Sequence, residues 1–136
     1  MTVTVVLDAS AALALLIDPG PAGEQVAARL DGASVVAPDL LPYEVTNVLR
    51  RHRNTGRLSE AEAQLALDGL RSLSVELWPH AVLADRVWSL GGNLSAYDAA
   101  YVALAERLDA VLLTADARIA GAPGVTCAIE DVALDR

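Results

Sequence analysis

Residues 3–7, Val-Thr-Val-Val-Leu, form a continuous apolar run that is rich in β-branched side chains. Such a run is typical of a strand that is covered on both faces, as in a parallel sheet. Asp8 ends the run, and residues 9–17 are predicted to form a short helix. A buried strand that leads directly into a helix is the repeating unit of α/β domains. This stretch therefore decides the fold class that we expect.

The rest of the chain continues the alternation of strands and helices. Ser59 and Glu62 have the spacing of a capping box, and Ser95 is expected to cap a helix on which Tyr97 and Tyr101 share an apolar stripe. Because no linker divides the chain, residues 1–136 are predicted to form one three-layer α/β domain with a mainly parallel sheet. Further strands are expected over residues 34–37, 74–78, 110–114 and 126–129, and further helices over 24–30, 40–53, 60–73, 81–90 and 96–108.

The composition excludes several kinds of chemistry. The 136 residues carry a net charge of −8, with 54% apolar residues and no lysine. A P-loop lysine, a Schiff-base lysine and a Ser–Lys dyad are therefore excluded. Cys127 is the one cysteine, which excludes an internal disulfide, and it is expected to be a small buried core residue. Because no apolar run is long enough to span a membrane and no basic residue starts a signal peptide, we predict a soluble cytoplasmic protein.

Two acidic residues follow two of the predicted strands. Asp8 comes directly after the first strand, and Asp116 comes two residues after Thr114, which ends the fourth. Because ligands of parallel α/β sheets bind outside the carboxyl ends of the strands, both acids are expected at one binding edge. Each acid alone also fits a helix N-cap, which is a common place for aspartate. Ser10 and Thr114 beside them weaken that purely structural interpretation.

Two further acids are expected on helix faces that border the core. Glu44 has Leu41 and Val48 about one turn away, and Asn47 follows it on the same side. Asp98 lies on the apolar side of its helix, with no basic residue one turn further on. The structural alternatives are a surface glutamate and a helix-start aspartate that complements the helix dipole.

Four acids that converge without a local cation raise one another's pKa and cannot all ionise at low cost. A divalent metal ion resolves this repulsion, and oxygen ligands without His or Cys suit Mg²⁺ or Mn²⁺ rather than Zn²⁺. His52 and His80 have no partner at metal-ligand spacing and are expected to be structural. A metal ion held by the four carboxylates would activate water and orient a phosphate.

Four motifs follow one another along the chain: VVLDASAAL (5–13), PYEVTNVL (42–49), SAYDAAYVALAERL (95–108) and LLTAD (112–116). In this order they resemble the motifs of the PIN-domain nucleases, and more closely those of the VapC toxins of bacterial VapBC toxin–antitoxin pairs. The resemblance implies a three-layer α/β/α PIN-like domain and an Mg²⁺- or Mn²⁺-dependent endoribonuclease. It also implies a homodimer, held inactive by a VapB-like antitoxin whose C-terminal segment enters the acidic site.

The resemblance also implies roles for individual residues. Ser10 and Thr114 match the small hydroxyl positions beside the metal site, and Asn47 matches the polar residue one turn after the helix acid. Since no acid of the pattern is missing, we do not expect an inactive relative. The catalytic and metal-ligating residues would be Asp8, Glu44, Asp98 and Asp116.

Other side chains fit RNA as the substrate less specifically. A cluster of four arginines just past the Glu44 helix can bind phosphates, or can simply complement the helix dipole at a solvated end. Trp78 and Trp88 are expected to pack in the core or at an interface, and Tyr97 either stacks on a base or packs in the core. The four arginines are Arg50, Arg51, Arg53 and Arg57.

The sequence thus predicts an endoribonuclease toxin that hydrolyses RNA phosphodiester bonds with a metal-activated water. One alternative is a PIN-type RNA-processing nuclease that acts without an antitoxin, which the absence of a neighbouring antitoxin gene would favour. The other is a non-catalytic module that binds RNA or a partner and whose acids are structural. Such a module would bind RNA equally well in the presence of a chelator.

Overall fold

Residues 2–132 are described by a computed structural model, in which five strands form one sheet. The strand order is β3-β2-β1-β4-β5, and every neighbouring pair is parallel. This confirms the predicted parallel sheet. The strands are β1 (Thr4–Leu7), β2 (Ser34–Pro38), β3 (Glu76–Trp78), β4 (Val111–Thr114) and β5 (Ile129–Asp131).

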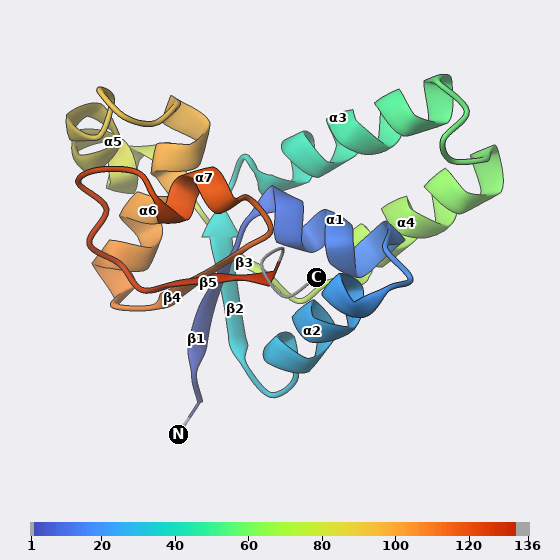
Figure 1. Cartoon of the computed structure of the whole chain (residues 1–136), viewed down its shortest axis with the longest axis horizontal. Helices are drawn as coiled ribbons and strands as arrows, with labels where there is room; N and C mark the ends of the chain where they lie inside the picture. Colours follow the sequence, from blue (N-terminus) through green and yellow to red (C-terminus); the bar gives the residue numbers. More distant parts are fainter. Residues whose placement is uncertain (1, 133–136) are drawn as a thin grey trace.

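The helices cover both faces of this sheet and complete three layers. Figure 1 shows α1 to α4 on one side of the strands and α5 to α7 on the other. The helices are α1 (Ala9–Ile17), α2 (Pro21–Leu30), α3 (Leu41–Asn54), α4 (Glu60–Ser72), α5 (His80–Ser89), α6 (Ala96–Leu108) and α7 (Ala117–Ala120).

The strand order creates a crevice at the centre of the sheet. β1 pairs with β2 on one side and with β4 on the other, so the connections after β1 and after β4 leave in opposite directions. Such a reversal is where parallel α/β sheets bind their ligands. Asp8 directly follows β1, and Asp116 follows β4 by two residues, so the fold brings both acids to this crevice.

The central strand and α6 form the middle of the core. Val5, Val6 and Leu7 are fully buried, and α6 contacts β1, β2 and β4. Seven consecutive residues of α6, from position 99 to position 105, are buried, and four of them are alanines. Their small side chains let the helix lie close to the sheet, which is how a chain without phenylalanine closes its core.

Several predicted boundaries shift in the structure. α2 begins at Pro21 rather than at residue 24, because proline fits the first turn of a helix. β5 covers residues 129–131 rather than 126–129, because Thr126 donates both its N–H and its hydroxyl to Glu106. Helix α7, with four residues, is too short to leave a periodic pattern. The capping box of Ser59 and Glu62 is confirmed.

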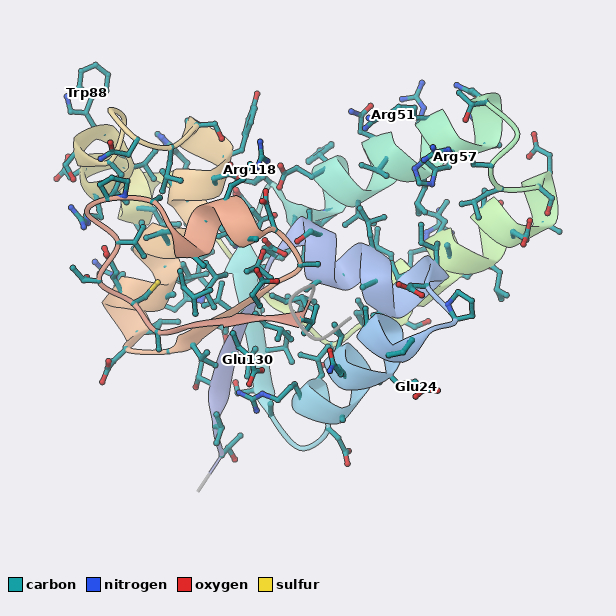
Figure 2. All side chains as sticks on the ribbon, in the orientation of Figure 1. Glu24, Arg51, Arg57, Trp88, Arg118 and Glu130 are labelled. Atoms are coloured by element: carbon teal, nitrogen blue, oxygen red, sulfur yellow. The ribbon has the colours of Figure 1, made fainter. Side chains whose placement is uncertain are left out.

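Two aromatic side chains lie on the surface. Tyr97 is 64% exposed, so its assignment to the buried stripe of α6 was wrong, although Tyr101 is buried as predicted. The first turn of α6 extends beyond the part of the helix that the sheet covers. Trp88 is 88% exposed, and Figure 2 shows it pointing away from α5, which excludes a place in the core. Cys127 is half-buried and packs against the edge of the core.

Gly23 lies where α2 approaches the end of α1. A Cβ at position 23 would lie 2.2 Å from the carbonyl oxygen of Asp18 and 2.7 Å from that of Ala14. Because backbone atoms cannot rotate away, Gly23→Ala should lower the free energy of unfolding by about 1–3 kcal/mol. Urea unfolding measures this loss. Gly92→Ala is the matched control, since a Cβ there meets nothing within 4 Å, and equal losses in both variants would contradict the expectation.

Glu106 joins α6 to the segment between α7 and β5. Its carboxylate accepts hydrogen bonds from Arg86 Nε at 2.6 Å, from Arg86 Nη2 at 3.1 Å and from the N–H and hydroxyl of Thr126. Arg86 also donates to the carbonyl oxygen of Gly124 at 2.9 Å. The Arg86 guanidinium lowers the pKa of Glu106 to about 2. The ionised carboxylate therefore stabilises the folded state.

Replacing Glu106 with glutamine should destabilise the domain by about 1–3 kcal/mol at neutral pH, because charged hydrogen bonds are lost. The pKa of Glu106 is lower in the folded state than in the unfolded chain. Its contribution is therefore complete above pH 4.5 and is lost as the pH falls toward 2. Denaturant unfolding at pH 7 and at pH 3 measures the difference between the parent and the variant. If the stability difference between the parent and the variant is as large at pH 3 as at pH 7, it does not come from the ionised carboxylate of Glu106.

Among residues 2–132, no helix combines the length and the apolar character needed to cross a bilayer.

Candidate active site

Asp8 is the most buried acid of the crevice, with 4% of its surface exposed. As the N-cap of α1, its Oδ1 accepts the Ala11 N–H at 2.9 Å and the Ser10 hydroxyl at 2.7 Å. Its Oδ2 accepts the hydroxyl of Thr114, at the end of β4, at 2.5 Å. Ser10 on α1 and Thr114 on β4 thus fix the side chain of Asp8 in one rotamer. The helix N-cap interpretation of Asp8 is therefore confirmed, while its part in a metal site stays a prediction.

Burial dominates the electrostatics of Asp8. Loss of solvent raises the pKa of its carboxyl, the hydrogen bonds from Thr114, Ala11 and Ser10 lower it in part, and the negative charge of Asp116 raises it again. Within residues 2–132, the groups that donate hydrogen bonds to Asp8 are all neutral. A positive charge brought to this carboxylate would therefore be strongly favoured.

Asp116 is the N-cap of α7 and is held by a cation from that helix. Arg118 donates to Asp116 Oδ1 from Nε at 3.0 Å and to Oδ2 from Nη2 at 2.7 Å, and its backbone N–H also donates to Oδ1. This bidentate contact with Arg118 lowers the pKa of Asp116. Arg118 itself is 84% exposed, and Figure 2 shows it on α7. The backbone N–H of Asp116 donates to Thr114 Oγ1 at 2.9 Å, which places the acid beside Asp8.

Glu44 enters the site from the first turn of α3 and meets α6. The hydroxyl of Tyr101 donates to Glu44 Oε1 at 2.6 Å. Burial raises the pKa of Glu44, the hydrogen bond from Tyr101 opposes this rise, and the charges of Asp98 and Asp8 add to it. Burial and the bond to Glu44 also raise the pKa of Tyr101, so the phenol stays protonated. Asp98 is half-buried, and its backbone N–H is capped by Ser95.

The four acids line a single cleft of about 310 Å³ at the carboxyl ends of the central strands. The predicted supporting residues Ser10 and Asn47 line the same cleft, and Arg51 lies at its edge. Thr114 is fully buried and acts on the cleft through Asp8. The acids that meet here are Asp8, Glu44, Asp98 and Asp116.

Sequence reasoning missed Tyr101 and Arg118 as parts of this site. Tyr101 was assigned to the core stripe, and its position three residues after Asp98 was the signal that it shares that part of the helix. Arg118 follows Asp116 by two residues, a spacing that allows a contact within one turn of chain. Both residues are bonded to acids of the cleft.

The arginine cluster is divided by the structure. Arg51 lines the acidic cleft, whereas Arg50 and Arg53 line a small hollow of about 50 Å³ between α3 and α4, together with Glu60. Arg57 lies in the turn that follows α3, and Figure 2 shows its side chain between α3 and α4. Since the side chains face different elements, only Arg51 is placed to meet a ligand of the cleft.

The donor chemistry of the cleft fits a divalent metal ion. Its carboxylate oxygens are the ligands that Mg²⁺ and Mn²⁺ prefer, and among the residues that the structure describes, Asp8 receives hydrogen bonds from neutral donors alone. Within residues 2–132, no three acidic, histidine or cysteine side chains are grouped closely enough to hold one ion together. Glu44 is held by Tyr101 and Asp116 by Arg118. Full coordination by three acids therefore requires local movement of these side chains.

Comparison with known proteins identifies the family. The family description "PIN domain" matches residues 5–125. This chain belongs to the PIN domain family. VapC ribonuclease Mb0985 of Mycobacterium bovis is 42% identical over 125 residues, which cover 92% of this chain and 95% of that protein. Ribonuclease VapC1 of Mycobacterium tuberculosis is 40% identical over 126 residues, with the same coverage of both chains.

Solved structures agree with the PIN domain fold. PAE2754 from Pyrobaculum aerophilum superposes with a TM-score of 0.71 at 28% identity, over 98% of this chain and 94% of that one. VapBC2 from Rickettsia felis, solved bound to a DNA fragment from its promoter, superposes with a TM-score of 0.64 at 12% identity, over 94% of this chain and 98% of that one. The second likeness shows the fold alone. The three-layer α/β/α architecture of this PIN domain is thus confirmed.

Arg118 competes with any metal ion for the carboxylate of Asp116. We therefore expect Arg118→Ala to tighten Mn²⁺ binding, by up to about fivefold, since an exposed ion pair contributes about 1 kcal/mol or less. Isothermal titration calorimetry of Mn²⁺ into the metal-free protein measures this change. Arg107→Ala, which removes an exposed arginine from the end of α6, is the control. Weaker binding in Arg118→Ala would show that the guanidinium supports the metal site.

Proposed function

We propose that this PIN domain, spanning residues 1–136, is the endoribonuclease toxin of a toxin–antitoxin pair. The observation that carries the proposal is the cleft at the ends of β1 and β4, where four carboxylates face one space. In the described part of the chain, the buried Asp8 of this cleft is bonded to neutral donors alone. Relatives at 40–42% identity that are named VapC ribonucleases support it. The four acids are proposed as both catalytic residues and metal ligands.

Each side chain has a distinct part in the proposed reaction. Asp8 is the fixed ligand, because Ser10 and Thr114 hold both of its oxygens in place. Asp98 and Asp116 complete the negative cleft from α6 and from the loop after β4. An Mg²⁺ or Mn²⁺ ion bound there would activate a water molecule, orient the phosphate and neutralise the leaving oxygen.

Glu44 is proposed as the acceptor of a proton from the attacking water. The hydrogen bond from Tyr101 to its Oε1, at 2.6 Å, holds the Glu44 carboxylate at the wall of the cleft, where a carboxylate can accept this proton. Asn47 and Arg51, both on α3, face the same cleft and are proposed to bind the RNA backbone near the cut. The arginines that face away, Arg50, Arg53 and Arg57, are proposed as weaker, outer phosphate contacts.

The partners follow from the same assignment. We propose an RNA substrate, a homodimer and a VapB-like antitoxin whose C-terminal segment occupies the cleft, with the protein at work in the cytoplasm. The acidic cleft suits a basic side chain from such an antitoxin, because four carboxylates line it and each can accept a charged hydrogen bond.

Cleavage of single-stranded RNA by the purified protein tests the proposal. The expected result is cleavage in Mg²⁺ or Mn²⁺, and none in excess chelator. Cleavage that continues in chelator would overturn the metal-dependent mechanism. RNA binding without cleavage in either metal would instead favour the non-catalytic module. Purification together with the products of the neighbouring genes shows whether an antitoxin is bound, and its absence would favour the RNA-processing nuclease.

A further inference from the structure

A second cavity lies beside the acidic cleft, at the same edge of the sheet. It has a volume of about 230 Å³ and is formed by the end of β2, the start of α3 and the facing sides of α5 and α6. Pro38 and Asp39 at the end of β2 line it, and His80 enters from just beyond β3. Because neighbouring parallel strands are about 4.8 Å apart, the end of β2 lies next to the end of β1, where Asp8 begins the cleft.

The two cavities share their walls. On α6, Asp98 and Tyr101 face the cleft, while Tyr97 and Ala100 face the second cavity. Likewise, Glu44 on α3 faces the cleft, and Leu40, the N-cap residue of α3, faces the second cavity. Each pair of residues is adjacent in the chain or one helical turn apart. A molecule that extends out of the cleft over α6 therefore reaches the second cavity at once.

The buried residues that line this cavity are apolar, and its polar residues, Asp39 and His80, are exposed at the opening. Leu83, Val87 and Ala100 are 2%, 8% and 7% exposed and form its interior. Tyr97 lies at the edge of the cavity and is 64% exposed, so much of its aromatic ring is open to contact with a ligand. The lining includes no arginine, and its one basic side chain, the imidazole of His80, is accompanied by the carboxylate of Asp39. A phosphate is therefore disfavoured here, while a flat, uncharged, hydrogen-bonding group is favoured.

We propose that this cavity binds one unpaired base of the RNA substrate, next to the phosphate that is cut; the inference rests on the function proposed above. The base stacks on the ring of Tyr97 and covers the aliphatic interior. Asp39 accepts hydrogen bonds from an exocyclic amino group of the base, as carboxylates do in base recognition. Only a base that is splayed out of a helix presents both its face and its edge in this way. Tyr97 and Asp39 are thus specificity-determining residues.

The test uses a pool of randomised single-stranded RNA whose cleavage products are sequenced. The parent should show a base preference at one position beside the cut, and Tyr97→Ala should lose that preference. Loss of base stacking should raise KM by roughly ten- to a hundredfold, with a smaller effect on kcat. Tyr97→Phe keeps the ring and should stay within about twofold of the parent. Trp88→Ala, which removes an exposed aromatic outside the cavity, should behave as the parent does.

A second readout needs no catalysis. Fluorescence anisotropy in chelator measures binding of a preferred RNA and of the same RNA with an abasic site at the recognised position. In the parent, the abasic site should reduce RNA affinity by the same factor as the Tyr97→Ala substitution does. In the Tyr97→Ala variant, the abasic site should cause no further loss of affinity. An unchanged preference and a full abasic effect in Tyr97→Ala would overturn the base pocket. The base pocket would also be overturned if Tyr97→Ala dissociated a dimer and kept the RNA base preference. That result would assign the cavity to a second copy of the chain. A parent that cuts no RNA would overturn the proposed function itself.

Discussion

Asp8→Asn is expected to reduce RNA cleavage by ~10³-fold or more while leaving the domain folded. The variant removes one negative charge from the centre of the cleft, and metal-ion catalysis is worth several kcal/mol. The asparagine oxygen still accepts the Ala11 N–H and the Ser10 hydroxyl. Its amide can donate to Thr114 Oγ1, which accepts in place of donating. Cleavage rates and a thermal unfolding curve measure the two effects separately.

The stability of Asp8→Asn should equal or exceed that of the metal-free parent. Burial raises the pKa of Asp8, so the folded state binds a proton more tightly than the unfolded chain does. Its contribution to stability is therefore present at low pH and is lost as the pH rises through the folded pKa. A neutral asparagine does not incur this loss. Asp85→Asn, on the exposed side of α5, is the control and should keep full activity. A folded Asp8→Asn variant that cuts RNA at the parental rate would remove Asp8 from the mechanism.

Mg²⁺ or Mn²⁺ is expected to raise the melting temperature of the parent by about 10 °C. An ion that binds the folded cleft and not the unfolded chain stabilises by roughly 2.7 kcal/mol at ~100 times its Kd. For a domain of this length, each kcal/mol corresponds to about 3–5 °C. Differential scanning fluorimetry with and without chelator measures the shift. Ca²⁺ is expected to stabilise the fold as well, without supporting cleavage.

Variants of the cleft acids provide the control for this thermal-shift measurement. Asp8→Asn and Asp98→Asn should lose most of the metal-dependent shift, while Asp85→Asn should retain it. Equal shifts in all of these proteins would mean that the ion binds elsewhere. Because the shift is measured without RNA, it tests the metal site independently of the reaction.

Local sequence was sufficient for the elements and for the edge at which the acids meet. The apolar run at residues 3–7 predicted the central strand, and the capping box of Ser59 and Glu62 forms as its spacing indicated. The position of Asp8 and Asp116 after two strands predicted their meeting, because parallel strands end at one edge of the sheet. These features depend on residues within a few positions of one another, or on a rule that all parallel sheets obey.

The partners of the acids could not be predicted in the same way. The hydrogen bond between Tyr101 and Glu44 joins residues 57 positions apart, and it depends on how α3 and α6 are rotated against each other. The periodicity of α6 assigned Tyr97 and Tyr101 to one buried stripe, yet the sheet covers only the second of them. Likewise, the four neighbouring arginines after Glu44 point to different elements, because α4 packs against one side of α3.

The sequence by itself determined the strands and helices, the parallel sheet and the convergence of Asp8 and Asp116. Only the tertiary structure decided which side chains hold the acids, which arginine reaches the cleft and that Tyr97 borders a second cavity. The physical reason is the range of the interactions. Hydrophobic periodicity and capping act within one or two turns of chain, so a sequence displays them directly. The rotation and crossing of packed helices depend on all of the side chains between them, and small contacts such as those of the α6 alanines set the distances.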